Sequence, residues 1–221
     1  MNQYDSLQSH STGAALSTSK MVRNTYLLLS VTLLFSALAA TWSVWFELGR
    51  TAAMLLSFAS FGILFWVQKT ADSAQGLIAI FAFTGCLGAA LGPMLSFYLK
   101  LPSGPTLVME ALALTALVFL ALSAYAMTSK RDFSFMGGFL VTGMLVVFVA
   151  MLANIFLQIA VLSMVLPAAI VLIMSGLILF ETSRIVHGGE TNYIRATLSL
   201  YLSFYNLFTA ILQLLGGFQR R

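Results

Sequence analysis

The sequence predicts an all-α integral membrane protein, a bundle of seven transmembrane helices. Hydrophobic residues make up 60% of the 221 residues and charged residues only 8%. A soluble domain is typically about half apolar and a quarter charged, so this composition indicates a chain that lies in a bilayer. The charge-free segments also have the length of roughly 20 residues that a helix needs to cross a membrane.

The first four predicted spans follow one another with short connections. They cover residues 26–46, 51–68, 76–99 and 111–128, and none of these segments contains a charged residue. Each can therefore cross the hydrocarbon core, which is about 30 Å thick, as a single helix.

The next charge-free segment, residues 133–180, is too long for one span. At about 1.5 Å per residue, a continuous helix of its 48 residues would be roughly twice as long as the hydrocarbon core is thick. The segment must fold back once, and we place the turn near Gln158, before Pro167. The last predicted span covers residues 196–218.

The amino-terminal segment differs from the rest of the chain. Residues 1–24 contain no apolar run, and their Ser, Thr, Gln and Asn content predicts a disordered tail in front of a membrane domain of residues 25–218. The same segment has no apolar core of the kind found in a signal peptide.

The orientation is predicted from Lys and Arg, which are enriched in cytoplasmic connections. Six lie in the tail and in the connections after the second, fourth and sixth spans, and four lie on the other side. We therefore expect the amino terminus in the cytoplasm and the carboxyl terminus in the periplasm. The first group is Lys20, Arg23, Lys69, Lys130, Arg131 and Arg184, and the second is Arg50, Lys100, Arg220 and Arg221.

Residue content argues against several classes of function. The single Cys86 allows no intramolecular disulfide, and His10 and His187 are far apart with no zinc-binding spacing, so we expect no cofactor and no metal. No basic patch with interleaved aromatic residues indicates nucleic-acid binding. The last span has no lysine for a retinal Schiff base, and no predicted span contains a histidine that could activate a serine. We therefore expect no catalytic residue and no enzyme activity.

Small residues recur along the third predicted span, in "GLIAIFAFTGCLGAALGPMLSFY". Gly85, Gly88 and Gly92, together with Ala89, are spaced three or four residues apart, which lets a neighbouring helix approach closely. Pro93 can kink the end of this helix. Helix packing is the ordinary explanation for such a pattern, and a role in a pore or ligand site is the alternative.

Several of these motifs together resemble the Bax inhibitor-1 family over about residues 20–218. The matching stretches include "ILFETSRI" and "LSLYLSFYNLF", which resemble the sixth and seventh helices of that family. The two signature motifs are Gly92-Pro93-x-Leu95 and Ala111-x-x-x-Thr115-Ala116-Leu117-Val118-Phe119.

The resemblance implies both a fold and a function. The stretches "NTYLLLSVTL" and "ETSRIVHGGETNYIRATLSLY" are most similar to the proteobacterial inner-membrane branch of the family. This similarity implies a seven-helix bundle with the last helix near its centre. It also implies a non-enzymatic role as a substrate and modulator of the membrane-bound, ATP-dependent protease FtsH. The alternative that the family offers is a pH-sensitive leak for calcium or protons.

Charged residues are concentrated in "FETSRIVHGGETNYIRA", residues 180–196. The ordinary explanation is a cytoplasmic connection, with Gly188 and Gly189 in the turn and Thr191 or Asn192 capping the last helix. Glu181 is different because it directly follows a long apolar run, and an ionisable group inside a membrane span is a functional candidate.

The family resemblance gives Glu181 a possible partner. In some members, an acid at this position faces a second acid in the last helix, and the pair shares a proton. The second position is Ser203 here, so the two-carboxylate sensor is incomplete, which weakens the leak hypothesis. Ser203 and Asn206 could still donate hydrogen bonds to Glu181, and Arg184 or Arg195 could pair with it. These five residues form the predicted proton- or ion-sensing cluster.

Overall fold

The computed structural model describes residues 3–129 and 131–218, with side chains from Thr18 onward, and every regular element in these ranges is helical. The elements are α1 (Gln3–Trp45), α2 (Arg50–Thr70), α3 (Ala74–Ala90), α4 (Gly92–Leu99), α5 (Gly104–Thr128), the short 3₁₀ helix η1 (Ser134–Met136), α6 (Gly137–Leu157), α7 (Leu162–Val186) and α8 (Tyr193–Phe218).

Within the described chain, 7 segments are long and apolar enough to cross a membrane. Helices α3 and α4 together form the third of them, and η1 with α6 forms the fifth. The predicted seven-helix membrane bundle is therefore confirmed.

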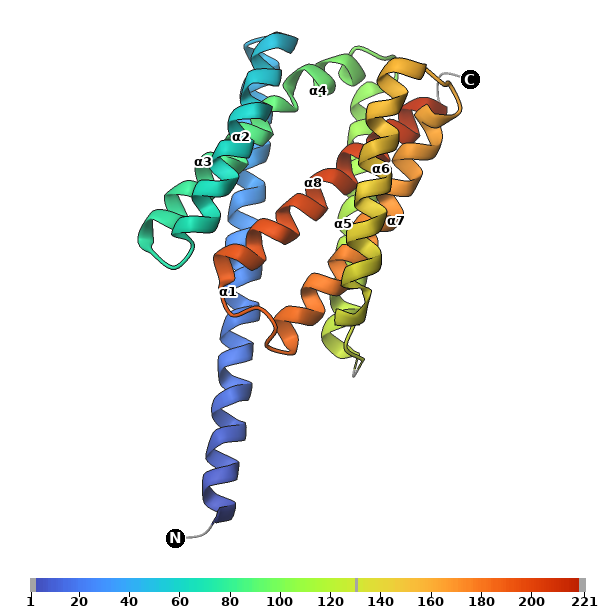
Figure 1. Cartoon of the computed structure of the whole chain (residues 1–221). Coiled ribbons are helices and arrows are strands. Elements are labelled where there is room, and N and C mark those ends of the chain that lie inside the picture. The colour runs from blue at the N-terminus through green and yellow to red at the C-terminus, as the bar shows by residue number, and fades with distance from the viewer. Residues whose placement is uncertain (1–2, 130, 219–221) are drawn as a thin grey trace.

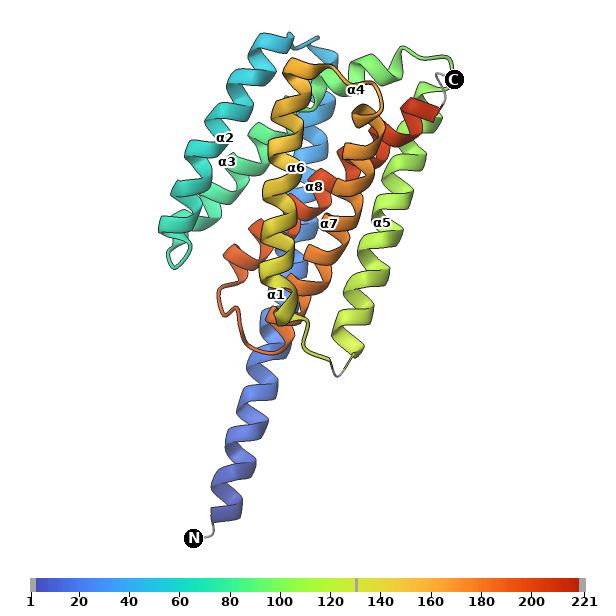
Figure 2. The same cartoon turned by 45° about the vertical axis from the view of Figure 1, so that its right-hand side comes forward.

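The third span is broken rather than continuous. Helix α3 ends at Ala90, Leu91 lies in a turn, and α4 begins at Gly92 with Pro93 in its first turn. Proline has no backbone N–H to donate and its ring collides with the preceding turn, so a helix cannot pass through it undisturbed. Figures 1 and 2 show α4 leaving the direction of α3 and running toward α5.

The fifth and sixth spans turn back at the predicted residue. Gln158 ends α6 in the left-handed conformation, at φ 49°. Its N–H donates to the carbonyl of Asn154, and the Asn154 side chain accepts the N–H of Ile159 at 3.0 Å. An amide side chain thus stabilises a sharp turn where the helix leaves carbonyls unpaired.

Helix α8 lies at the centre of the bundle. It packs against α1, α3, α5 and α7, and Figures 1 and 2 show it crossing obliquely among them. Leu200, Tyr201, Leu207 and Leu212 are completely buried along it. Helix α6, in contrast, packs mainly on α7 and leaves most of its surface to lipid.

The small residues of the third span lie against α1. A Cβ atom added to Gly85 would lie 2.8 Å from the ring of Phe35, one added to Gly88 would collide with the backbone of Ser36, and one added to Gly92 would collide with Ser43. The absence of side chains at these positions is what allows α1 to approach α3 and α4 so closely.

Two helices begin more than one helical turn before the spans that the sequence predicted. Helix α5 starts at Gly104 instead of residue 111, so Glu110 is an exposed residue within the helix. Helix α1 continues back to Gln3, and Met21 and Val22 already pack against the core. The side chains of residues 1–17 lie outside the described part of the structure, so the disordered tail of residues 1–24 stays a prediction.

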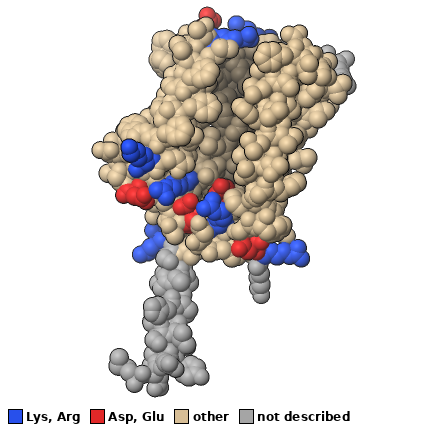
Figure 3. Space-filling model, viewed as in Figure 1, with Lys and Arg blue, Asp and Glu red and all other residues tan. Residues whose placement is uncertain are grey.

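Charged side chains gather at the two ends of the bundle, and an uncharged band separates them (Figure 3). This is the distribution that a bilayer imposes, because ionised groups are costly in hydrocarbon. Which end faces the cytoplasm stays a prediction from the Lys and Arg count. Lys130, Arg220 and Arg221, three of the residues counted, lie outside the described residues.

Candidate functional site: the charged end of the bundle

The stretch 180–196 forms the last turns of α7, the connection to α8 and the first turn of α8. It lies at the end of the bundle from which α1 extends, and acidic and basic side chains gather there in Figure 3. We call this region the charged end. Its polar side chains tie three connections together: α2–α3, α5–α6 and α7–α8.

The turn after α7 is built around Gly188. Its φ of 77° is left-handed, a conformation that glycine adopts without steric cost. The N–H groups of Gly189 and Glu190 donate to the carbonyl of Arg184 at 2.8 and 3.2 Å, which satisfies a carbonyl in the last turn of the helix. The predicted glycine turn is therefore confirmed.

Asn192 caps the first turn of α8 and also binds the connection between α2 and α3. Its side-chain oxygen accepts the N–H groups of Ile194 and Arg195 at 2.9 and 3.1 Å. Its side-chain nitrogen donates to the carbonyl of Ala71 at 2.9 Å and to the carboxylate of Asp72 at 2.7 Å. One amide side chain thus uses both its donor and its acceptor capacity.

Arg195 strengthens the same link. Its guanidinium lies 2.8 Å from the Asp72 carboxylate, the shortest of the ion pairs among the described residues. The prediction offered Arg184 or Arg195 as the partner of Glu181, and the structure pairs Arg195 with the connection between α2 and α3 instead.

Glu181 pairs with Arg184, one turn further along α7. The two charged groups are 3.5 Å apart, and Glu181 is only 9% exposed. The same guanidinium lies 3.7 Å from the Glu190 carboxylate, donates to the carbonyl of Gly189 at 3.2 Å and stands over the ring of Phe180 at 5.5 Å. Arg184 therefore compensates two carboxylates at once, which lowers the cost of burying Glu181.

Ser183 ties the connection between α5 and α6 to α7. Its hydroxyl is completely buried, accepts the N–H of Phe133 at 2.9 Å and donates to the carboxylate of Asp132 at 3.2 Å. His187 lies on the other side, with Nδ1 3.3 Å from the Ser183 hydroxyl and 2.9 Å from its carbonyl. Hydrogen bonds from Ser134 to the exposed carboxylate hold the pKa of Asp132 below its usual value.

A serine, a histidine and an aspartate thus meet here, but not in the order that hydrolysis requires. In a catalytic triad the acid orients the histidine, and the histidine activates an accessible serine. Here the aspartate and the histidine both contact the serine, whose buried hydroxyl also accepts a backbone N–H. This arrangement anchors a loop.

Ser203 and Asn206, the two predicted site residues on α8, make other contacts. Ser203 is buried on α8, and Asn206 donates to the carbonyl of Leu202 in its own helix at 2.8 Å. Among the described residues, no hydrogen bond joins either of them to Glu181. Of the five predicted residues, Glu181 and Arg184 form an ion pair, and the sensing role of this cluster stays a prediction.

The sequence did not single out the polar contacts that fix α8 inside the bundle. The buried Tyr201 hydroxyl is 2.7 Å from the Ser36 hydroxyl on α1 and donates to the carbonyl of Thr84 on α3 at 3.2 Å. Near the charged end, Thr197 donates to the carbonyl of Thr25 at 3.2 Å. A tyrosine in an apolar span signals that a buried partner is needed, but it does not say which helix supplies it.

The chain is similar to known proteins over nearly its whole length. The family model described as inhibitor of apoptosis-promoting Bax1 matches residues 18–220, which include all seven spans. The chain is 51% identical over 208 residues to a protein of Escherichia coli strain K12 named modulator of FtsH protease YccA, covering 94% of each chain. It has the same identity and coverage to a protein of E. coli O6:H1 named inner membrane protein YccA. It is also 50% identical over 202 residues to a membrane protein of Vibrio cholerae, covering 91% of each chain.

Proposed function

Because the chain belongs to the family of inhibitors of apoptosis-promoting Bax1, the Bax inhibitor-1 family, we propose that it modulates an FtsH-type protease in the bacterial inner membrane. The proposed role is non-enzymatic: the chain is both a substrate and an inhibitor of this membrane-bound, ATP-dependent protease. The observation that carries the proposal is the 51% identity, across 94% of both chains, to the E. coli protein named a modulator of FtsH.

The charged end supplies a surface suited to such a partner. Two connections are bound to residues 183–195 there: Asn192 and Arg195 hold the one between α2 and α3, and Ser183 holds the one between α5 and α6. Hydrogen-bonded and paired groups give the connections a defined shape, as a protein interface requires. Helix α1 extends from this end (Figure 1), so the amino-terminal segment and the surface are presented on the same side.

The predicted orientation places this surface in the cytoplasm, on the side of the membrane where the protease hydrolyses ATP. A protease that extracts membrane proteins must take hold of one end of the chain, and the amino-terminal segment is the end offered here. Occupying the protease through this segment, while the bundle resists extraction, would delay the turnover of other membrane substrates.

The alternative is a pH-sensitive leak for calcium or protons. That function rests on two carboxylates sharing a proton, which happens because two like charges held close cannot both ionise cheaply. In this chain Glu181 has an arginine 3.5 Å away, and the position of the second acid is the hydroxyl of Ser203. A carboxylate neutralised by a guanidinium favours a structural ion pair over proton sharing.

The proposal is tested by purified components in one membrane. An FtsH-type protease and a second membrane substrate are reconstituted in liposomes with and without the full chain. We expect the second substrate to be degraded more slowly when the chain is present, and the chain itself to be degraded. Unchanged turnover of the second substrate at a molar excess of the chain would contradict the proposal.

Co-purification provides an independent check in native membranes. The full chain, extracted in mild detergent, should bring an FtsH-type protease with it, and a chain lacking residues 2–17 but retaining Lys20 and Arg23 should show whether the amino-terminal segment contributes. Recovery of other partners without the protease would count against the proposed role.

A further inference from the structure

An apolar groove of about 600 Å³ runs along α1, and residues of α4, α5 and α8 form its other walls. Its walls include Leu34 and Ala37 of α1, Leu95 of α4, Val108 and Leu112 of α5, and Phe208 of α8. Leu34 is 67% exposed and Leu112 is 51% exposed, so one long side of the groove is open. In a membrane-spanning bundle, this open side faces the acyl chains of the lipid.

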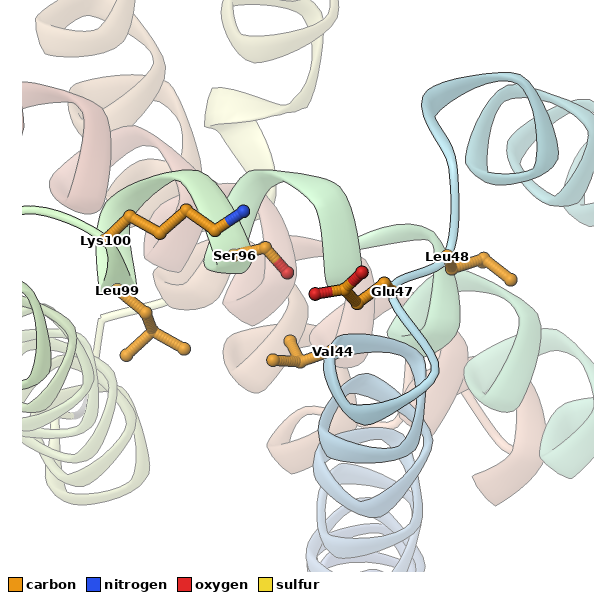
Figure 4. Close-up of a pocket in the computed structure, with 6 residues that line it drawn as sticks. All are labelled: Val44, Glu47, Leu48, Ser96, Leu99 and Lys100. Carbon is orange, nitrogen blue, oxygen red and sulfur yellow. The ribbon is translucent and has the colours of Figure 1, made fainter.

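A second hollow of about 400 Å³ lies at one end of this groove, away from the charged end. It is lined by Val44, Glu47, Leu48, Ser96, Leu99 and Lys100 (Figure 4). We call it the end pocket.

The groove and the end pocket share their walls. On α1, Ala37 and Thr41 line the groove and Val44 lines the end pocket, at the spacing of three or four residues that marks one face of a helix. On α4, Leu95 lines the groove and the next residue, Ser96, lines the pocket. The two hollows therefore adjoin along the same two helices.

The end pocket carries one charge of each sign. Figure 4 shows the carboxylate of Glu47 and the amino group of Lys100 pointing toward one another over Ser96. Both residues are exposed, and among the described residues no ion pair within 4.0 Å joins them. The end pocket thus presents a cationic group, at Lys100, and an anionic group, at Glu47.

The backbone at Glu47 supports a role for its carboxylate. Its φ of 47° is left-handed, which is unfavourable for a residue with a Cβ atom and is normally occupied by glycine or asparagine at the end of a helix. Strained backbone of this kind is concentrated at ligand-binding positions. Here it turns a glutamate toward Lys100.

We infer that the groove and the end pocket together bind one phospholipid with a zwitterionic headgroup, of the phosphatidylethanolamine class. One acyl chain lies in the groove, the phosphate lies on the Lys100 ammonium, and the headgroup amine lies on the Glu47 carboxylate. Along α1, Ser30 to Thr41 spans about 17 Å at 1.5 Å per residue, close to the roughly 15 Å of hydrocarbon in one leaflet. The length, the apolar lining and the charge order all match this lipid.

Native mass spectrometry of the full chain in mild detergent tests the headgroup assignment. Phosphatidylethanolamine and phosphatidylglycerol with the same acyl chains are the probes. We expect the wild type to bind the first about ten-fold more tightly, because only that lipid has an amine for Glu47. Lys100→Gln should lower the affinity for both lipids about ten-fold, and Glu47→Gln should remove the preference for phosphatidylethanolamine over phosphatidylglycerol. The matched controls, Arg50→Gln and Glu110→Gln, change exposed charges outside the end pocket and should leave both affinities unchanged.

A second pair of variants tests the groove. Ala37→Trp places a large ring where the acyl chain would lie and should lower the retention of phosphatidylethanolamine at least ten-fold. Ala124→Trp adds the same ring at an exposed position of α5 outside the groove and should retain it as the wild type does. Thermal unfolding of each variant shows whether it is folded.

Three outcomes would overturn the inference. Equal retention by Ala37→Trp and Ala124→Trp would place any bound lipid elsewhere. Equal affinity of the wild type for the two lipids, unchanged by Glu47→Gln, would refute the headgroup assignment. Absence of retained lipid in the wild type would refute the site altogether. The charge variants alter exposed side chains only, so the headgroup test remains decisive if Ala37→Trp does not fold.

Discussion

At the scale of single residues, Asn192 joins segments that lie far apart in the sequence. Its side chain caps α8 and binds the carbonyl of Ala71 and the carboxylate of Asp72. One residue therefore caps the start of α8 and also makes a long-range link. Sequence reasoning found only the first use, because capping depends on neighbours in the chain.

We expect Asn192→Ala to destabilise the protein by about 1–3 kcal/mol, since it removes a helix cap and leaves the Ala71 carbonyl and Asp72 without this donor. Thr191→Ala is the matched control. Thr191 is exposed, and its backbone N–H, not its side chain, donates to the Glu190 carboxylate. This substitution should lower the stability by less than about 0.5 kcal/mol. Thermal unfolding of both variants in the same detergent measures the loss of stability. Equal losses would refute the stabilising link from Asn192 to Ala71 and Asp72.

Asp132 predicts a pH dependence outside the membrane spans. Hydrogen bonds from Ser134 lower its pKa in the folded state, so its charged form is favoured more when folded than when unfolded. Its stabilising effect is therefore fully present above the ordinary pKa of about 3.9 and is lost as pH falls through the lower, folded value. We expect the wild type to unfold at a higher temperature than Asp132→Asn at pH 5–7, with the difference shrinking toward pH 3. A difference that does not vary with pH would contradict this assignment.

At the scale of helices, glycine decides how closely α1 packs on the third span. Gly85, Gly88 and Gly92 face α1 at Phe35, Ser36 and Ser43, with no room for a Cβ atom at the last two positions. The small-residue spacing that the sequence showed therefore corresponds to an interface. Which helix would lie across it could not be read from the spacing, because any helix can pack on a smooth face.

Two glycine substitutions should have opposite effects. Gly88→Ala places a methyl group against the backbone of Ser36 and should destabilise the protein by about 1–3 kcal/mol. Gly62→Ala, in the middle of α2, meets nothing within 4 Å and should stabilise it by about 0.5–1 kcal/mol, because alanine is the better helix former. Unfolding in detergent measures both changes. Destabilisation of similar size by both would show that the close approach of α1 is not what Gly88 provides.

At the scale of the whole molecule, seven spans place the two ends of the chain on opposite sides of the membrane. The excess of Lys and Arg predicts that the amino terminus lies in the cytoplasm. We therefore expect reporter fusions after Lys130 to be cytoplasmic and fusions at Arg221 to be periplasmic. A cytoplasmic carboxyl terminus would show that the predicted orientation or the count of spans is wrong.

The amino-terminal segment is expected to control how fast the protease degrades the protein. When unfolded, residues 1–20 would reach on the order of 65 Å, far enough to enter a pore above the membrane surface. We expect deletion of residues 2–17, with Lys20 and Arg23 retained, to lengthen the half-life and to increase the inhibition of other substrates.

The control replaces residues 2–17 by a Gly-Ser linker of the same length, which keeps a flexible end that the protease can grip. A half-life close to that of the wild type is expected for this variant. Equal half-lives of the full and the shortened chain, measured by pulse-chase with the protease present, would remove the segment from the mechanism.

The sequence by itself determined the membrane class, the number of spans, the turn at Gln158 and the glycine turn at Gly188. These features depend on local hydrophobicity and local backbone preference, which are properties of consecutive residues. The tertiary structure alone decided that Arg195 pairs with Asp72 and not with Glu181, and that Ser183 anchors the loop at Asp132. It alone also brought Glu47 and Lys100 together across the end pocket. Such pairings depend on how helices distant in the chain are packed and rotated, and the spacing of residues along one helix carries no information about the partner it will meet.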